Sequence, residues 1–452
     1  MTTAIRNLAD INAFLARHTD YEKQIGGRTR KTFDLERVTE VLNALARPDL
    51  SYTCAHVAGT KGKGSTSAFL ASMLQSQGLR TGLYTSPHLE RLTQRIAING
   101  QEISETAFVQ AFQPVVAAVE SRPGKAPDIT FFELLTLCAL VAFRQAGVQA
   151  AVLEVGLGGR LDATNVVSPA VCVITEIGLD HMQQLGNTVA EIAAEKAGII
   201  KPGVPVVCGA QDPEAQRVIN RTARDMEAPL LMYGRDYSIR GIQRSGCSLE
   251  FTADVKGQRY EKVRLPHPGR YMADNAAHAL CALEVLATDS DLLPEGTLQR
   301  ERALDALART ELPGKFEVFE GEPIVVIDSS HNELSLKAAV ATARNIARGP
   351  VVLVTGIAAD KDLEACLKHL AAGADAAVFT RYYSPRESDP TALLSLYQKF
   401  GGKRGAAEEH PEAALEEAID LAGPQGLVLV TGSTYLAGAL RAAACDYARR
   451  EA

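Results

Sequence analysis

The sequence lacks the features that mark several classes of protein. Lysine and arginine form no basic run, and the formal net charge is −7, which argues against a nucleic-acid-binding surface. The longest strongly apolar stretch, Leu134–Phe143, is too short to cross a bilayer, and Met1–Asp10 has no basic-then-apolar signal layout. The eight cysteines stand singly without a Cys-x-x-Cys pair, as in cores of reduced cytosolic proteins. A soluble cytoplasmic protein without nucleic-acid or membrane partners is therefore expected.

Neither a fixed-period repeat nor a low-complexity tract divides the 452 residues, and a prior of about 150 residues per domain suggests two or three domains. Apolar strands alternate with helical segments from Thr53 to about Val207, a pattern typical of a parallel sheet covered by helices, and two of the predicted helices span 131–145 and 189–197. Apolar and polar residues alternate over 237–265, which predicts a small antiparallel segment. A second strand–helix series begins after Pro313-Gly314. We therefore predict an α/β protein with an N-terminal parallel-sheet domain of the phosphate-loop type (residues 1–311) and a smaller, Rossmann-like C-terminal α/β domain (residues 312–452).

A glycine-rich turn follows the first predicted strand, and a helix is predicted from Ser65 to Gln77. Glycines at 59, 62 and 64 allow backbone N–H groups to face one point, where Lys63 and the helix N-terminus add positive charge. The Ser65 hydroxyl is placed to reach a phosphate-bound Mg²⁺. The common phosphate-loop spacing would require glycine at position 57, which is valine here. A turn without a ligand is the alternative, but the glycines and lysines together favour a nucleotide site.

Polar side chains follow three further predicted strands, at Ser86, Glu154 and His181. The carboxyl ends of parallel strands meet at one sheet edge, so a hydroxyl, a carboxylate and an imidazole would gather beside the phosphate loop. This is a plausible Mg²⁺ environment, although Mg²⁺ prefers oxygen and an isolated loop histidine is more often only hydrogen-bonded. A dinucleotide site at Gly156-Leu-Gly158 is excluded because leucine stands at position 161 and no helix is expected to follow.

These stretches together resemble the folylpolyglutamate synthase/dihydrofolate synthase family, within the Mur-ligase-like ATP-dependent amide ligases. The resemblance spans nearly the whole chain in order, and its most specific string is Leu-Glu-Val-Gly-Leu-Gly-Gly-Arg-Leu-Asp-Ala-Thr-Asn at 153–165. The other matching strings lie at residues 56–66, 84–89, 179–181 and 195–203, with weaker ones at 268–270, 274–276, 328–332 and 430–433.

The resemblance implies roles for particular residues. Lys63, His181 and Lys196 would be the catalytic residues, and the family carbamylates the lysine that Lys196 matches to hold a second Mg²⁺. Without the family, Lys196 would be an ordinary surface lysine near a helix C-terminus. The implied Mg²⁺ ligands are Ser86, Glu154, His181 and Lys196. The implied ATP-binding residues are Gly59, Thr60, Lys61, Gly62, Lys63, Gly64, Ser65, Thr66, Asn275, Lys315, Asp328 and His331.

The implied activity is that of an ADP-producing acid–amino-acid ligase, a monomer in the family. ATP would convert a folate or dihydropteroate carboxylate to an acyl phosphate, which the amino group of L-glutamate attacks. Three departures from the family pattern affect acceptor specificity or nucleotide contacts: Lys61 where asparagine is common, Lys315 where arginine is usual, and Asp328-Ser-Ser-His-Asn-Glu333 in place of Asp-Gly-Ala-His-Asn-Pro. A ligase with another acid acceptor and a nucleotide-binding protein without turnover remain alternatives. A kinase or motor NTPase would leave the 153–165 string unexplained.

Overall fold

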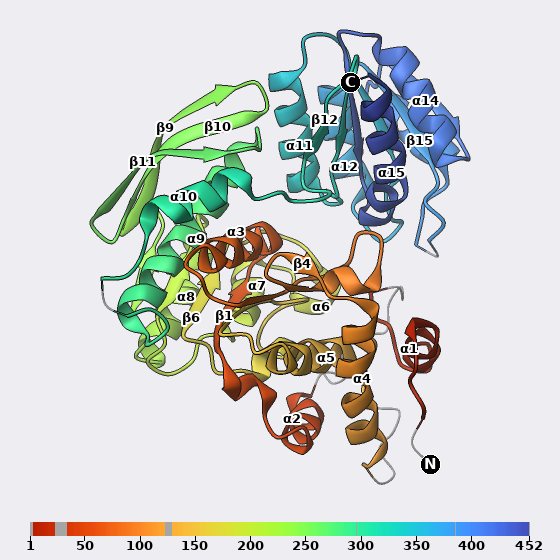
Figure 1. Cartoon of the computed structure of the whole chain (residues 1–452). Coiled ribbons are helices and arrows are strands. Elements are labelled where there is room, and N and C mark those ends of the chain that lie inside the picture. Colours follow the sequence, from red (N-terminus) through yellow and green to blue (C-terminus); the bar gives the residue numbers. More distant parts are fainter. Residues whose placement is uncertain (1–2, 23–33, 123–128, 295, 385, 452) are drawn as a thin grey trace.

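The computed structural model describes residues 3–22, 34–122, 129–294, 296–384 and 386–451. Figure 1 shows two α/β units, the larger one built around an eight-stranded sheet and the other, near the C-terminus, around a six-stranded sheet. A three-stranded antiparallel sheet stands beside them. None of the described helices is long and apolar enough to traverse a bilayer.

The large sheet is parallel except at one edge, where β3 and β4 run antiparallel. The antiparallel edge was not predicted, because both strands are too short to show a periodic pattern. Residues of β1 alternate between the faces, so that Cys54 and Ala58 contribute to cores on one side and Ala55 and Val57 to a core on the other. In spatial order the strands are β4 (Gln101–Glu102), β3 (Ile96–Ile98), β2 (Thr81–Tyr84), β5 (Ala150–Glu154), β1 (Thr53–Ala58), β6 (Val171–Ile174), β7 (Val206–Cys208) and β8 (Leu230–Met232).

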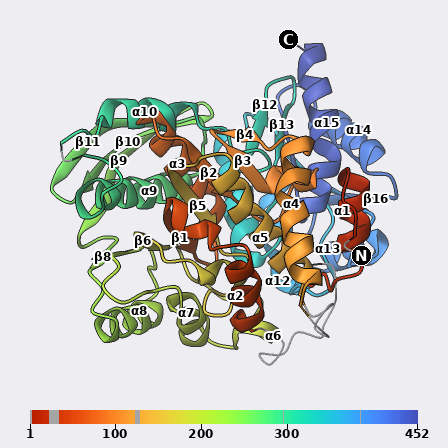
Figure 2. The same ribbon diagram turned by 60° about the horizontal axis from the view of Figure 1, so that its bottom comes forward.

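Helices cover both faces of this sheet, as its apolar residues on both sides require (Figure 2). Capping boxes at Thr130 and Thr188 begin two of these helices, which match the predicted ranges 131–145 and 189–197. The helices of this unit are α1 (Leu8–Leu15), α2 (Leu35–Ala44), α3 (Lys63–Ser76), α4 (Glu105–Glu120), α5 (Phe131–Gln145), α6 (Met182–Leu185), α7 (Val189–Ala197), α8 (Pro213–Asp225), α9 (Arg270–Asp289) and α10 (Arg300–Arg309). Short 3₁₀ turns are η2 (Pro48–Ser51), η3 (Leu92–Arg95) and η4 (Ala163–Val166).

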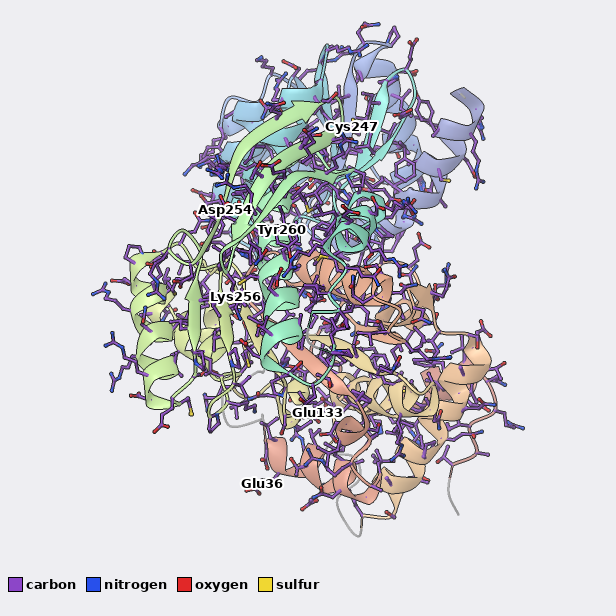
Figure 3. The ribbon with its side chains drawn as sticks, turned by 60° about the vertical axis from the view of Figure 1, so that its left-hand side comes forward. Glu36, Glu133, Cys247, Asp254, Lys256 and Tyr260 are labelled. Carbon is purple, nitrogen blue, oxygen red and sulfur yellow. The ribbon has the colours of Figure 1, made fainter. Side chains whose placement is uncertain are left out.

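The predicted antiparallel segment forms a sheet of three strands, β9 (Tyr237–Ser245), β10 (Ser248–Val255) and β11 (Gln258–Leu265). Its apolar face packs with α3, α9 and α10 in one core. Figure 3 labels Asp254 and Tyr260 on this sheet and Lys256 in the turn between β10 and β11, and the buried Tyr260 hydroxyl donates a hydrogen bond to Glu284 of α9. The sheet therefore braces α9, the helix that carries Asn275.

The C-terminal sheet is also parallel apart from one short antiparallel edge strand, β12, which the sequence did not reveal. Helices α11, α12 and α13 cover one face, and α14 and α15 cover the other. The strands are β12 (Glu317–Phe319), β13 (Ile324–Ile327), β17 (Leu427–Thr431), β14 (Val351–Thr355), β15 (Ala376–Thr380) and β16 (Arg404–Glu408) in spatial order. The helices are α11 (Glu333–Ile346), α12 (Leu363–Gly373), α13 (Pro390–Lys399), α14 (Pro411–Ala422) and α15 (Thr434–Glu451).

The two α/β units touch at several points. Helix α15 approaches the segment after β2 so closely that a Cβ on Gly438 would lie 2.1 Å from the Leu89 carbonyl oxygen. Arg441 of the same helix pairs with Glu90 at 3.3 Å. Asp180, after β6, accepts hydrogen bonds from Asn332 and Lys361 of the C-terminal unit. These contacts bring the carboxyl ends of the two parallel sheets toward each other.

Candidate active site

The phosphate loop connects β1 to α3. The helix begins at Lys63, two residues before the predicted start at Ser65, because Gly62 takes a left-handed conformation (φ 82°) and serves as its N-cap. A Cβ on Gly62 would lie 2.1 Å from Asn275 Oδ1, so only glycine fits there. No side chain caps the helix, which leaves its first N–H groups available to an anion. Thr66 donates through its hydroxyl to the Asn275 carbonyl at 3.4 Å.

Two lysine ammonium groups meet at the carbonyl of Gly59. Lys63 Nζ donates to it at 3.0 Å, and Lys196 Nζ, from the last turn of α7, donates at 2.8 Å. Lys196 is 4% exposed, so the alternative of an ordinary surface lysine is wrong. Burial, together with the neighbouring charge of Lys63, lowers the pKa of Lys196 to about 7. Helix α7 thus places beside the phosphate loop a buried amine that loses its proton near neutral pH.

Glu154 ends β5 and faces the start of α3. Its carboxylate is 5% exposed and accepts the backbone N–H of Ser86 at 3.1 Å. A Cβ on Gly64 would lie 3.4 Å from both carboxylate oxygens, which places the carboxylate directly beside the helix N-terminus. Burial raises the pKa of Glu154, while the charges of Lys63 and of Lys315 from the C-terminal unit partly offset the effect. The site therefore contains a buried carboxylate with lone pairs to spare.

His181 lies in the loop between β6 and α6. Its backbone is left-handed (φ 49°), and its imidazole is 39% exposed, 3.8 Å from Asp180 Oδ1. The structure thus places His181 on the same sheet edge as Ser86 and Glu154. Across the described residues, no group of three or more His, Cys, Asp or Glu side chains is arranged to hold a metal. Any metal at this edge would rely on Glu154 and on hydroxyl, imidazole or substrate oxygen ligands.

The residues predicted on the C-terminal unit lie around the end of β13. Asp328 is buried and accepts N–H bonds from Phe316 (2.9 Å) and Ser330 (3.0 Å). Lys315 Nζ bonds Ser329 Oγ at 2.8 Å, and His331 Nδ1 lies 3.0 Å from the Ser329 carbonyl. Burial lowers the pKa of His331 to about 4, so the imidazole is neutral at pH 7. This cluster is internally hydrogen-bonded.

Sequence reasoning missed the residues that join the two edges. Asp180 and Asn332 lie within the matching strings at 179–181 and 328–332, which imply no role for them, and Lys361 lies in none of the matching strings. A signal was present for Lys361, because the charged run Asp360-Lys361-Asp362 follows the strand 351–355, where a parallel sheet presents functional groups. The structure brings Lys361 to 3.3 Å from Asp180.

The fold and this edge together define a class. A phosphate loop, a buried carboxylate beside it and a second α/β unit facing both are the arrangement of a Mur-type ATP-dependent amide ligase. The chain matches the Mur ligase middle domain over residues 57–283 and the Mur ligase glutamate ligase domain over residues 314–434.

Individual relatives narrow the class. The chain is 35% identical to the folylpolyglutamate synthase of Lacticaseibacillus casei, covering 92% of this chain and 95% of that one. It is 34% identical to the Bacillus subtilis dihydrofolate synthase/folylpolyglutamate synthase, covering 90% and 94%. Among solved structures, Escherichia coli FolC in complex with DHPP and ADP superposes with a TM-score of 0.85 at 30% identity over the full length of both chains. The chain belongs to the folylpolyglutamate synthase/dihydrofolate synthase family, as its motifs indicated.

Proposed function

We propose that the protein ligates L-glutamate to the carboxylate of a folate or of dihydropteroate, consuming ATP and releasing ADP and phosphate. The observation that carries the proposal is the meeting of Lys63, Lys196 and the Glu154 carboxylate around one phosphate loop, in a chain of this family. Relatives solved with ADP, and one with DHPP as well, support the same substrates here.

The residues suit an acyl-phosphate route. A carboxylate is a poor electrophile, so transfer of the ATP γ-phosphoryl group to it comes first, and the glutamate amine then displaces phosphate to form the amide. Backbone N–H groups at the uncapped start of α3 face the phosphates, and Lys63 leaves the Gly59 carbonyl to bind them. Asn275 abuts the loop at Gly62, while Asp328, His331 and Lys315 would position the rest of the nucleotide from the C-terminal unit.

Mg²⁺ fits the donor set of this edge. Glu154 is a buried carboxylate with oxygen lone pairs to spare, and the Ser86 hydroxyl and His181 imidazole lie on the same edge. We propose that Ser86, Glu154 and His181 hold the ion, with Ser65 near it. When bound, Mg²⁺ supplies positive charge that offsets the charge of the transferring phosphoryl group.

We further propose that the neutral amine of Lys196 adds to CO₂ and releases a proton, and that the resulting carbamate would hold a second Mg²⁺. The amine is buried against the Gly59 carbonyl and next to the cationic Lys63, so a carbamate at this position would be an anion that the Lys63 ammonium can pair with. As for the whole molecule, we propose a cytoplasmic monomer without nucleic-acid partners, and all eight cysteines are free thiols.

The test is mass spectrometry of products after incubation of the purified protein with ATP, Mg²⁺, L-glutamate and either dihydropteroate or a reduced folate. A gain of one glutamyl unit on dihydropteroate establishes the synthase step, and a gain on the folate establishes polyglutamylation. ATP binding without either product would refute folate acceptors and favour a ligase for another acid. The departures at Ser329, Ser330 and Glu333 motivate that second candidate.

A further inference from the structure

One short segment, residues 176–181, contacts the phosphate loop through Glu176 and Gly178, and we call it the clamp segment. The Glu176 carbonyl accepts the backbone N–H groups of Thr60 (2.9 Å) and Lys61 (3.2 Å). The Thr60 hydroxyl donates to the Gly178 carbonyl at 3.1 Å and accepts the Gly178 N–H at 3.2 Å. A shift of the clamp segment would therefore move the loop that receives the phosphates.

The same segment contacts the C-terminal unit. Asp180 accepts Asn332 Nδ2 on Oδ2 at 2.8 Å and pairs with Lys361 Nζ through Oδ1 at 3.3 Å. The Asp180 and Lys361 side chains are each 11% exposed, so water screens the pair weakly. A Cβ on Gly178 would lie 2.9 Å from the Leu334 side chain of α11, which shows how closely the unit sits against the clamp segment.

The clamp segment ends at the proposed metal ligand His181. Asp180 Oδ1, which faces Lys361, also accepts the backbone N–H of His181 at 2.9 Å. His181 holds a left-handed conformation (φ 49°), which is strained for a non-glycine residue and must be held by its surroundings. Asp180 is the residue whose carboxylate joins this strained backbone to the other unit.

We propose that Asp180 is a positioning residue that couples docking of the C-terminal unit, through Lys361 and Asn332, to the placement of His181 and the phosphate loop. The inference rests on the proposed function for the role of His181. Docking then favours metal and nucleotide binding, and by linkage metal and nucleotide favour docking to the same degree. Glutamate would meet a complete metal site only after the two units have closed.

The experiment removes the cation that docks on Asp180. In Lys361→Met, the Mg²⁺ concentration for half-maximal rate should rise roughly fivefold or more, the range expected for coupling between sites. Binding of Mn²⁺ in the presence of ADP, followed by electron paramagnetic resonance without turnover, should weaken by the same factor. Lys361→Arg keeps the charge and should restore most of the affinity. Lys368→Met is the matched control, because Lys368 is 57% exposed and its only ion pair among the described residues is the 3.9 Å contact with Glu364 on its own helix.

Two results would overturn the inference. Unchanged Mn²⁺ affinity in Lys361→Met, with a raised KM for glutamate alone, would make Lys361 a direct substrate contact. Additive effects of Asp180→Asn and Lys361→Met on Mn²⁺ affinity would show that the two residues act independently. Because Mn²⁺ binding requires no acceptor, this test remains decisive even where product analysis refutes the folate substrates. If Lys361→Met does not fold, the affinity of Lys361→Arg relative to Asn332→Ala decides the question in the same way.

Discussion

The charged groups on the two facing sheet edges differ in how many hydrogen-bond partners they have within the protein. On the N-terminal edge, Glu154 and Lys196 are buried, each with one hydrogen bond from or to the backbone in the described structure. On the C-terminal edge, Asp328 already accepts two N–H bonds, and Lys315 and His331 are engaged with Ser329. Both edges are parallel-sheet ends, so topology alone does not set this difference.

The difference separates two tasks. Buried charges with few partners are costly in the free protein, and a ligand of opposite charge relieves that cost on binding. We therefore expect the reacting groups to bind at the N-terminal edge. The C-terminal edge is complete by itself, so it can present a fixed surface to the nucleotide. Substitutions on the first edge should affect turnover, and substitutions on the second should affect stability and nucleotide affinity.

The largest effect is expected for Lys63→Ala. This substitution removes the cation of the phosphate loop, and turnover should fall by about 10³-fold or more, since charge stabilisation is the main catalytic term in phosphoryl transfer. Steady-state ADP release measures the loss. Lys262→Ala, on the exposed side of β11, is the control and should retain full activity. A rate close to wild type would refute the role of Lys63.

The next largest effect is expected for Lys196→Ala. If Lys196 carries a carbamate, the variant should lose most activity, and short carboxylic acids should restore part of it by supplying the missing carboxylate. Rescue is measured as the rate against added acetate or formate, with the Lys63→Ala variant as the control that such acids cannot rescue. Full activity of the unrescued variant would exclude carbamylation.

Asp328→Asn tests the C-terminal edge, where the charged groups already have hydrogen-bond partners. The new amide NH₂ would face either the Phe316 or the Ser330 N–H, and the lost hydrogen bond should cost about 1–3 kcal/mol of unfolding free energy. We expect a lower Tm and a raised KM for ATP with a smaller change in kcat. Asp420→Asn, exposed on α14, should change none of these quantities. A loss confined to kcat would contradict the division between the edges.

The smallest effect is expected for Glu176→Gln, which should change the unfolding free energy by an amount that depends on pH. Burial raises the pKa of Glu176 to about 7, and its buried Oε2 has no hydrogen-bond partner. A raised carboxyl pKa means that the charged form destabilises the fold above pH 7, and that this cost fades as pH falls from about 7 toward the unfolded value of about 4.5. Glutamine should therefore increase the unfolding free energy by about 1 kcal/mol at pH 8 and by almost nothing at pH 5. Equal increases in unfolding free energy at pH 8 and pH 5 would contradict the raised pKa of Glu176.

Strand–helix alternation and capping residues were enough to predict most of the fold. The ranges 131–145 and 189–197 were correct because capping boxes and helix ends are written in local sequence. The start of α3 was misplaced by two residues because the left-handed Gly62 depends on its fit against Asn275, far away in the chain. The edge strands β3, β4 and β12 are too short to carry a pattern.

The candidate site was predictable where residues follow strands, and not where it depends on packing between distant segments. Ser86 and Glu154 lie where strand ends predicted them. The burial of Lys196 arises from its approach to Gly59, 137 positions earlier, which a helix-end lysine does not reveal. The pairing of Asp180 with Lys361 joins two units and has no local signature.

Gly438 approaches Leu89 so closely that a larger residue at this position would separate the two α/β units. The Cβ of any other residue there would lie 2.1 Å from the Leu89 carbonyl oxygen, too close for two atoms that are not bonded, and would push the two α/β units apart without changing the residues of either sheet edge. A Gly438→Ala or Gly438→Val protein would thus be an enzyme whose two units are held apart, and it would be suited to crystallising the open form.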